Sequence, residues 1–267
     1  MAVINNRIGK MEYLTAEGIT VPHCFTTRLG GVSKGHLASM NIGIRRGDDP
    51  ENVAENFRIL GQAVGFTLAD LVSTRQTHSD IVWQVGRAQR GTAITLGSSP
   101  ECDALITNEP GTGLVVYTAD CTPILLHDPV TGAVGAVHAG WRGTAAALAE
   151  KTVNAMVSAF GCDPANIHAA IGPNIGPCHF ETDADVPNAM LAAFGPAAEP
   201  FIRRAGEKYY VNLKEINALA LCRAGVMHIE ISQECTMCRP DRYWSHRITG
   251  ANRGSQGAII LCKEGRQ

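Results

Sequence analysis

The sequence has no long apolar run, and this argues against a chain that crosses a bilayer as a helix. No segment approaches the roughly 20 apolar residues that such a helix needs. The first residues, MAVINNRIGKMEYL, also lack the apolar core of a secretory signal peptide. We therefore expect a cytoplasmic protein with no membrane partner.

An excess of charge of either sign is also missing. Lys and Arg number 23 and Asp and Glu number 25, which gives a net charge of −2. This balance argues against a broad electrostatic surface for nucleic acid, and we expect no nucleic-acid partner. There is no low-complexity segment, linker or fixed repeat, so we expect one domain spanning residues 1–267.

The cysteines do not form an even, regularly spaced set, which argues against a disulfide framework. There are nine of them: Cys24, Cys102, Cys121, Cys162, Cys178, Cys222, Cys235, Cys238 and Cys262. We expect free thiols, mostly buried as packing residues. Cys235-Thr-Met-Cys238 is a lone CxxC without a second pair at zinc-ribbon spacing. We expect it to be packing, with a redox or metal role as the alternative.

Apolar periodicity predicts a mixture of strands and helices. Helices are expected at residues 51–65, 144–161, 185–195 and 213–225. Strands are expected at 23–27, 71–73, 81–85, 114–117, 122–127, 133–138, 166–171 and 257–264. Because several strands follow one another as hairpins, the pattern favours an α+β fold with antiparallel pairing over a doubly wound parallel sheet.

The segment TADCTPILLHDPVTGAVGAVHAGWRG, residues 118–143, places a cysteine before one strand and a histidine at the end of the next. A hairpin with its loop at residues 128–131 would put Cys121 directly opposite His138, on the same face. Three interpretations fit this pair: a packed core contact, a Cys–His catalytic dyad, or two metal ligands. A metal would need at least one further ligand.

His78 is one candidate for that ligand, because RQTHSDIV is a polar connection between two apolar runs. Spacing alone does not favour His78 over His179 or His246.

Six segments, in this order, resemble the YfiH/PgeF family, also described as polyphenol oxidase or laccase-domain proteins. They are HCFTTRLGGVSKG, SMNIGIRRGDDPENVAEN, RQTHSDIV, CDALITNEPG, TADCTPILLHDPVTGAVGAVHAGWRGT and IGPNIGPCHFE. The resemblance covers nearly the whole chain. It implies a four-layer α/β/β/α sandwich with mixed, largely antiparallel sheets, and zinc held by His78, Cys121 and His138. Asn174 stands where the family often has a cysteine.

The resemblance further implies a zinc-dependent purine nucleoside phosphorylase acting on adenosine, inosine and methylthioadenosine, with adenosine deaminase activity. The expected partners are a small nucleoside and phosphate; protein partners stay open. A Cys/His/His zinc would leave one position for water or substrate. His78, Cys121 and His138 are therefore also catalytic candidates. Asp120, beside the ligand, is a candidate proton shuttle; the alternative, which we favour, is a carboxylate that caps backbone amides.

Phosphorolysis also needs an anion site, for which arginine forks are well suited. The substrate-binding candidates are Arg28, Asn41, Arg45 and Arg142, each of which could instead have a structural role. Arg142 is expected two residues before a helix, whose free N–H groups also favour anions.

Two other functions compete with this reading. A copper-dependent polyphenol oxidase of the laccase type needs many histidine ligands, yet the chain has nine histidines and no H-x-H pair. Copper could still bind the same three residues, since it outcompetes zinc at such sites. The second alternative is a cytoplasmic amidase or cysteine hydrolase that edits peptidoglycan precursors, with Cys121 as nucleophile and His138 as base.

Overall fold

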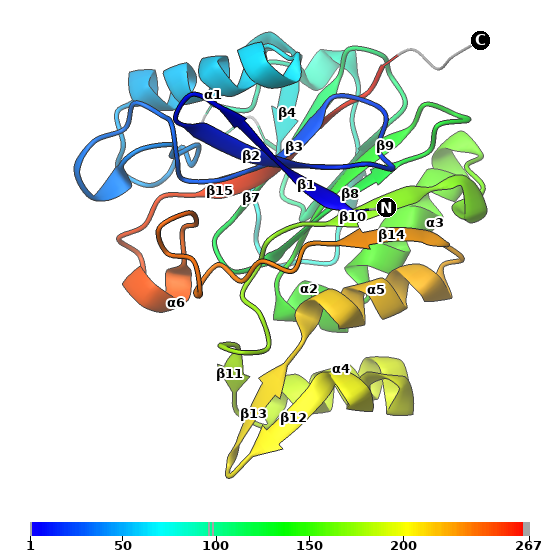
Figure 1. Cartoon of the computed structure of the whole chain (residues 1–267). Helices are drawn as coiled ribbons and strands as arrows, with labels where there is room; N and C mark the ends of the chain where they lie inside the picture. The colour runs from blue at the N-terminus through cyan, green and yellow to red at the C-terminus, as the bar shows by residue number, and fades with distance from the viewer. Residues whose placement is uncertain (1, 96, 98, 264–267) are drawn as a thin grey trace.

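The structure is a computed structural model that describes residues 2–95, 97 and 99–263. Two six-stranded sheets lie at its centre and pack face to face (Figure 1). The contact between them is an apolar layer to which both sheets contribute alternate residues, such as Phe25 and Val116 from the first and Leu105 and Leu125 from the second. Strand side chains point alternately to the two faces, so each sheet has a second face left to cover.

The first sheet has the strand order β1-β2-β3-β15-β7-β4, in which only the β4–β7 pair is parallel. Its strands are β1 (Val3–Ile8), β2 (Met11–Ala16), β3 (His23–Thr26), β4 (Leu71–Ser73), β7 (Gly113–Thr118) and β15 (Gln256–Leu261). β1 and β2 were not predicted from the sequence. β1 is the edge strand and β2 lies next to it. Four of the six residues of β1 are exposed, so the strand lacks a clear apolar alternation.

The second sheet has the order β14-β10-β8-β9-β6-β5, with parallel pairs at its two edges and antiparallel pairs between. Its strands are β5 (Val82–Gln84), β6 (Ala104–Thr107), β8 (Thr122–His127), β9 (Val134–Ala139), β10 (His168–Ile171) and β14 (His228–Ile231). The sequence analysis did not predict β6 and β14.

Helices cover the two outer faces. α1 (Pro50–Val64) packs Val53, Phe57 and Leu60 on the first sheet. α3 (Leu148–Phe160) and α5 (Leu213–Arg223) cover the second. The expected α+β class with a four-layer α/β/β/α sandwich is thus confirmed.

Local signals explain where these helices begin and end. Asp49 caps α1 by accepting the Glu51 N–H, and Gly65 ends it with φ at 95°. The helix expected at 144–161 is instead two helices, α2 (Trp141–Ala145) and α3. Ala147 adopts a φ of 53° between them, outside helical geometry. Arg142 therefore lies inside α2 rather than before a helix.

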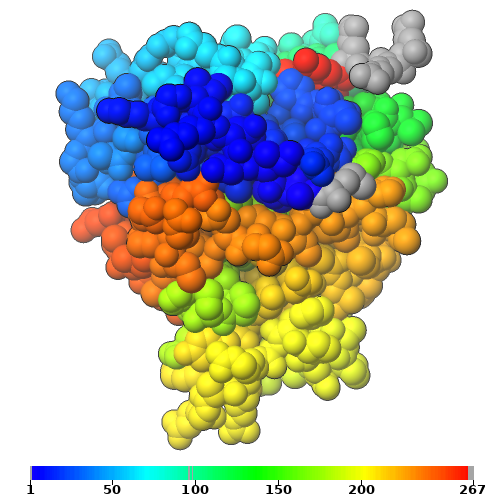
Figure 2. Space-filling view, viewed as in Figure 1, coloured from blue at the N-terminus to red at the C-terminus, as the bar shows by residue number. Residues whose placement is uncertain are grey.

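A small lobe projects from the sandwich and contains α4 (Asp185–Phe194) and a three-stranded sheet (Figures 1 and 2). The strands of this lobe are β11 (Glu181–Thr182), β12 (Ile202–Ala205) and β13 (Lys208–Val211). The lobe connects β10 to α5, and only its helix was predicted. The chain also forms α6 (His246–Thr249) and five 3₁₀ turns: Gly35–Leu37, Leu68–Asp70, Arg87–Gln89, Pro164–Asn166 and Gly195–Phe201. In the described part of the chain, no helix combines the length and apolarity that a bilayer crossing requires.

Candidate active site

The β8–β9 hairpin holds the cysteine and histidine of the central motif, but its register differs from the expected one. Asp128 pairs with Ala133 and Pro123 lies opposite His138, so the loop is residues 129–132. The Asp128 side chain accepts the Val130 N–H, and Gly132 adopts a φ of 74° to close the turn.

The expected direct pairing of Cys121 with His138 is therefore wrong by two residues. A shift of two preserves the face on which a side chain points, because strand side chains alternate. Cys121 precedes β8 and lies on the face of His138, as its diagonal neighbour.

His78 joins this pair from the loop between β4 and β5. Its Nε2 lies 3.8 Å from Cys121 Sγ, and its ring centroid lies 5.1 Å from that of His138. All three ligand atoms lie within 4.8 Å of one another. His179 and His246, the other candidates by spacing, are not members of this group.

Asp103, which the sequence analysis did not single out, organises the group. Its carboxylate accepts the N–H groups of Thr77, His78 and Ser79 and the Ser79 hydroxyl. It also lies 2.8 Å from Nδ1 of His138. Burial raises the pKa of Asp103, but hydrogen bonds from His138 and Ser79 outweigh it and bring the pKa to about 2. The available sequence signal for Asp103 was its position in CDALITNEPG, directly before the apolar residues that form β6.

Unusual φ values and a glycine allow the three side chains to come together. His78 and Asp120 have φ values of 59° and 84°, a conformation that is uncommon for residues other than glycine. Gly140 follows β9, and a Cβ there would lie 2.8 Å from His78 Cδ2 and 3.2 Å from Cys121 Sγ. Gly140, the first glycine in HAGWRG, therefore leaves room for the side chains of His78 and Cys121.

The electrostatics of the group favour an ionised thiol. Burial raises the pKa of Cys121, but the adjacent His138 and His78 lower it to about 6. Burial disfavours the imidazolium of His138, yet Cys121 and Asp103 raise its pKa to about 9. Thiolate and imidazole nitrogen are ligands that zinc and copper both accept, so this donor set fits a metal ion with one position left open.

The group lines a pocket with about 170 Å³ open to water-sized molecules. Four arginines line it: Arg45, Arg46, Arg75 and Arg253. Arg75 pairs with Glu101 at 2.5 Å. Within the described residues, the other three arginines form no ion pair with a carboxylate. Burial lowers the pKa of Arg253 to about 10, and repulsion from Arg46 adds to this.

Of the four substrate-binding candidates, the structure places only Arg45 in this lining. Arg28 donates to the carbonyls of Pro240 and Ala38 and stacks on Trp244. The exposed Arg142 stacks on Trp141. Substrate contact by these two arginines stays a prediction.

Asn41 and Asp120 do not line the pocket, and both form hydrogen bonds with other groups of the protein. Asn41 Oδ1 accepts the N–H groups of Gly43 and Ser255, both of which line the pocket. The Asp120 carboxylate accepts from the hydroxyls of Thr236 and Ser245 and from the Arg247 N–H. These contacts match the capping interpretation of Asp120; a proton-shuttle role stays a prediction.

Fold and site together define an α+β protein with a Cys/His/His group beside an arginine-lined pocket. The chain belongs to the multi-copper polyphenol oxidoreductase laccase family, whose profile matches residues 22–263. The expected YfiH family membership is confirmed.

Its relatives carry a different description. The chain is 37% identical over 240 residues to purine nucleoside phosphorylase YlmD of Geobacillus stearothermophilus, covering 88% of this chain and 86% of that protein. It is 36% identical over 228 residues to purine nucleoside phosphorylase YfiH of Escherichia coli, covering 85% and 88%. The crystal structure of YlmD from Geobacillus stearothermophilus superposes with a TM-score of 0.91 at 34% identity, over 98% of this chain and 100% of that one.

Proposed function

We propose that this protein is a purine nucleoside phosphorylase that cleaves adenosine, inosine and methylthioadenosine and also deaminates adenosine. The observation that carries the proposal is a set of three arginines, Arg45, Arg46 and Arg253, that have no carboxylate partner in the described part of the chain. They line the same pocket as His78, Cys121 and His138. The names of the relatives support the same reaction class.

The arginines account for the phosphate half of the reaction. One guanidinium group can bind two phosphate oxygens at once. In addition, an anion between Arg46 and Arg253 relieves the repulsion between the two positive charges. Bound in this way, phosphate is held for attack on the anomeric carbon of the nucleoside. The C–O bond to phosphate forms as the N-glycosidic bond breaks, and the purine leaves with the proton that dihydrogen phosphate gives up. The same positive charge favours phosphate over water as the nucleophile.

The Cys/His/His group would supply the ligands of a metal ion. His78, Cys121 and His138 would hold zinc, and the ion would supply a Lewis acid in the pocket. Asp103 fixes the His138 ring so that Nε2 faces the group. Copper at the same ligands is the alternative that metal analysis decides. If the zinc assignment holds, a copper-free, zinc-loaded sample should not oxidise phenols at a meaningful rate.

The amidase alternative has one observation in its favour. Cys121, His138 and Asp103 line up as nucleophile, base and orienting carboxylate if no metal is bound. A zinc-bound thiolate is not a free nucleophile, so zinc content separates the two functions.

The deciding experiment measures inosine cleavage and adenosine deamination in Arg253→Lys and Arg45→Lys, with and without phosphate. Loss of a charged hydrogen bond of about 1.5–3 kcal/mol predicts a roughly 10- to 150-fold slower phosphorolysis. Deamination uses water and should largely be spared. Arg203→Lys, at an exposed position of β12, is the matched control. If phosphate never accelerates nucleoside cleavage, the phosphorylase proposal fails and the amidase moves forward.

A further inference from the structure

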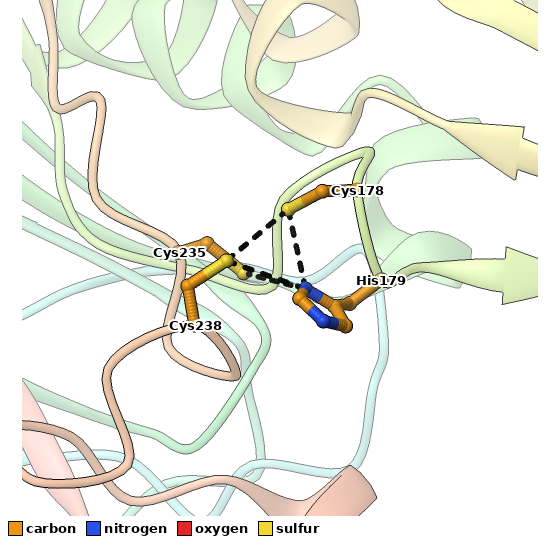
Figure 3. A group of neighbouring side chains, drawn as sticks. All are labelled: Cys178, His179, Cys235 and Cys238. Atoms are coloured by element: carbon orange, nitrogen blue, oxygen red, sulfur yellow. Dashed lines mark hydrogen bonds between the residues drawn. The ribbon is translucent and has the colours of Figure 1, made fainter.

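A second group of metal-ligand side chains lies outside the pocket (Figure 3). It consists of Cys178, His179, Cys235 and Cys238, whose ligand atoms all lie within 4.8 Å of one another. Cys178 and His179 come from the loop after β10, and the two other cysteines come from the loop after β14. Because β10 and β14 are parallel neighbours, their carboxyl ends meet at the same edge and bring the two loops together.

Four of the distances between ligand atoms lie close to those of a tetrahedral ion site. His179 Nδ1 lies 3.3 Å from Cys178 Sγ, 3.7 Å from Cys235 Sγ and 3.4 Å from Cys238 Sγ. Cys178 Sγ and Cys238 Sγ are 3.6 Å apart. Zinc bonds of about 2.3 Å to sulfur and about 2.0–2.1 Å to nitrogen place tetrahedral ligand atoms about 3.5–3.8 Å apart.

One backbone contact favours the anionic, ligating form of Cys235. The Gly176 N–H donates to Cys235 Sγ at 3.2 Å. N–H donors of this kind stabilise a thiolate and orient it toward a metal. The CxxC expected to be packing thus has one buried cysteine, Cys235, and one exposed cysteine, Cys238.

A buried cation, Lys214, lies close to the CxxC. Lys214 is only 6% exposed, and its Nζ donates to the carbonyls of Ser232 and Glu234, just before the CxxC. Among the described residues, it forms no ion pair with a carboxylate. A buried ammonium needs a compensating negative charge. Three thiolates around one divalent ion carry a net charge of −1, which supplies it.

We propose that Cys178, His179, Cys235 and Cys238 form a second metal site that holds one zinc ion in a closed, structural coordination. Four protein ligands leave no open position, in contrast to the three of the first group. On binding, the thiols lose their protons to solvent and no electron is transferred. Three sulfurs and one nitrogen in tetrahedral arrangement select zinc over magnesium or calcium.

The second metal site would connect the loop that leads into the small lobe with the candidate active site. Thr236, inside the CxxC, donates its hydroxyl to Asp120 at 2.6 Å, and Asp120 precedes the ligand Cys121. The Thr236 N–H donates to the Asn174 carbonyl, and the Ile175 N–H donates to that of Asp120. Zinc at the second site would therefore hold both loops against the backbone that carries Cys121.

The test is metal analysis of full-length protein purified under reducing conditions with zinc as the metal supplied. We expect two zinc ions per chain in the wild type, and one in Cys178→Ser and in Cys238→Ser. Cys222→Ser, at an exposed cysteine of α5 outside both groups, is the matched control and should keep two.

Cys121→Ala separates this proposal from the proposed function, because it removes only the first group. It should retain one ion, and cobalt substituted there should give the thiolate charge-transfer band and strong visible bands of a tetrahedral, cysteine-rich site. If wild type and Cys121→Ala both hold one ion, the second site stands and the first fails. Cys121→Ala without any bound metal overturns the second site, as does mass-spectrometric evidence that Cys178 and Cys238 form a disulfide.

Discussion

Nδ1 of His138 lies 2.8 Å from Oδ1 of Asp103, and this contact fixes how the histidine takes part in the site. An ionised carboxylate only accepts hydrogen bonds, so Nδ1 carries the proton and Nε2 is left to face Cys121 and His78. Because Asp103 also accepts three N–H groups of the His78 loop, one carboxylate positions two of the three proposed ligands.

Asp103→Asn should weaken zinc binding at the first group by about 10- to 100-fold, the usual effect of losing a partner behind a ligand. An amide has one acceptor oxygen and cannot satisfy both His138 and the loop. Zinc affinity is measured by competition with a chelator. Asp163→Asn, at an exposed helix cap where asparagine is equally suitable, is the control. Unchanged affinity in Asp103→Asn would show that the contact does not position the ligand.

Cys121→Ala should remove the zinc of the first group while the fold survives, because the residue precedes β8 and is only partly buried. The measurement is zinc per chain together with a circular dichroism spectrum. Cys222→Ala is the comparison and should lose no metal. Wild-type zinc content in Cys121→Ala would refute the ligand assignment.

Gly140→Ala should also reduce zinc at the first group, by steric conflict alone. Gly140 has φ at −67°, which alanine adopts without strain, but its Cβ would meet the His78 ring at 2.8 Å. Gly143→Ala, whose Cβ would meet its nearest atom at 3.5 Å, should keep the metal. Zinc content and activity are measured for both. Equal zinc in the two variants would mean that the site adjusts without cost.

Acid should destabilise the protein partly through His127, a buried residue of β8 near His168, His23 and Asp128. Burial lowers its pKa to about 4, and repulsion from His168 adds to this. Since the unfolded chain titrates near 6.5, it binds the proton first as pH falls. The stability contribution is present above pH 6.5 and is lost toward pH 4, to the extent of about 3 kcal/mol.

The check is the free energy of unfolding from pH 7 to pH 4.5 in the wild type and in His127→Gln. The variant should show the shallower pH dependence, whereas His36→Gln, at an exposed position, should follow the wild type. Parallel curves for wild type and His127→Gln would contradict the assignment.

Much of the local structure could be predicted because it depends on neighbours in the chain. The apolar periodicity of residues 51–65 and the glycine at its end defined α1, and the apolar runs before and after the turn at Asp128 defined the β8–β9 hairpin. The predicted register was wrong because the turn closes one residue later at each side. Cys121 and His138 still meet, since a shift of two residues preserves the face of a strand.

Tertiary structure shows how distant residues join them. By spacing, His78 was equivalent to His179 and His246, and only the family resemblance singled it out. The structure adds the reason, because Asp103 holds the His78 loop beside β9. Arg253 reaches the pocket from near the end of the chain, and no local pattern distinguishes it from Arg28. Cys178 and Cys238 lie 60 residues apart and meet because β10 and β14 are adjacent. Sequence fixes which side chains a segment offers, but strand order determines which segments lie at the same sheet edge.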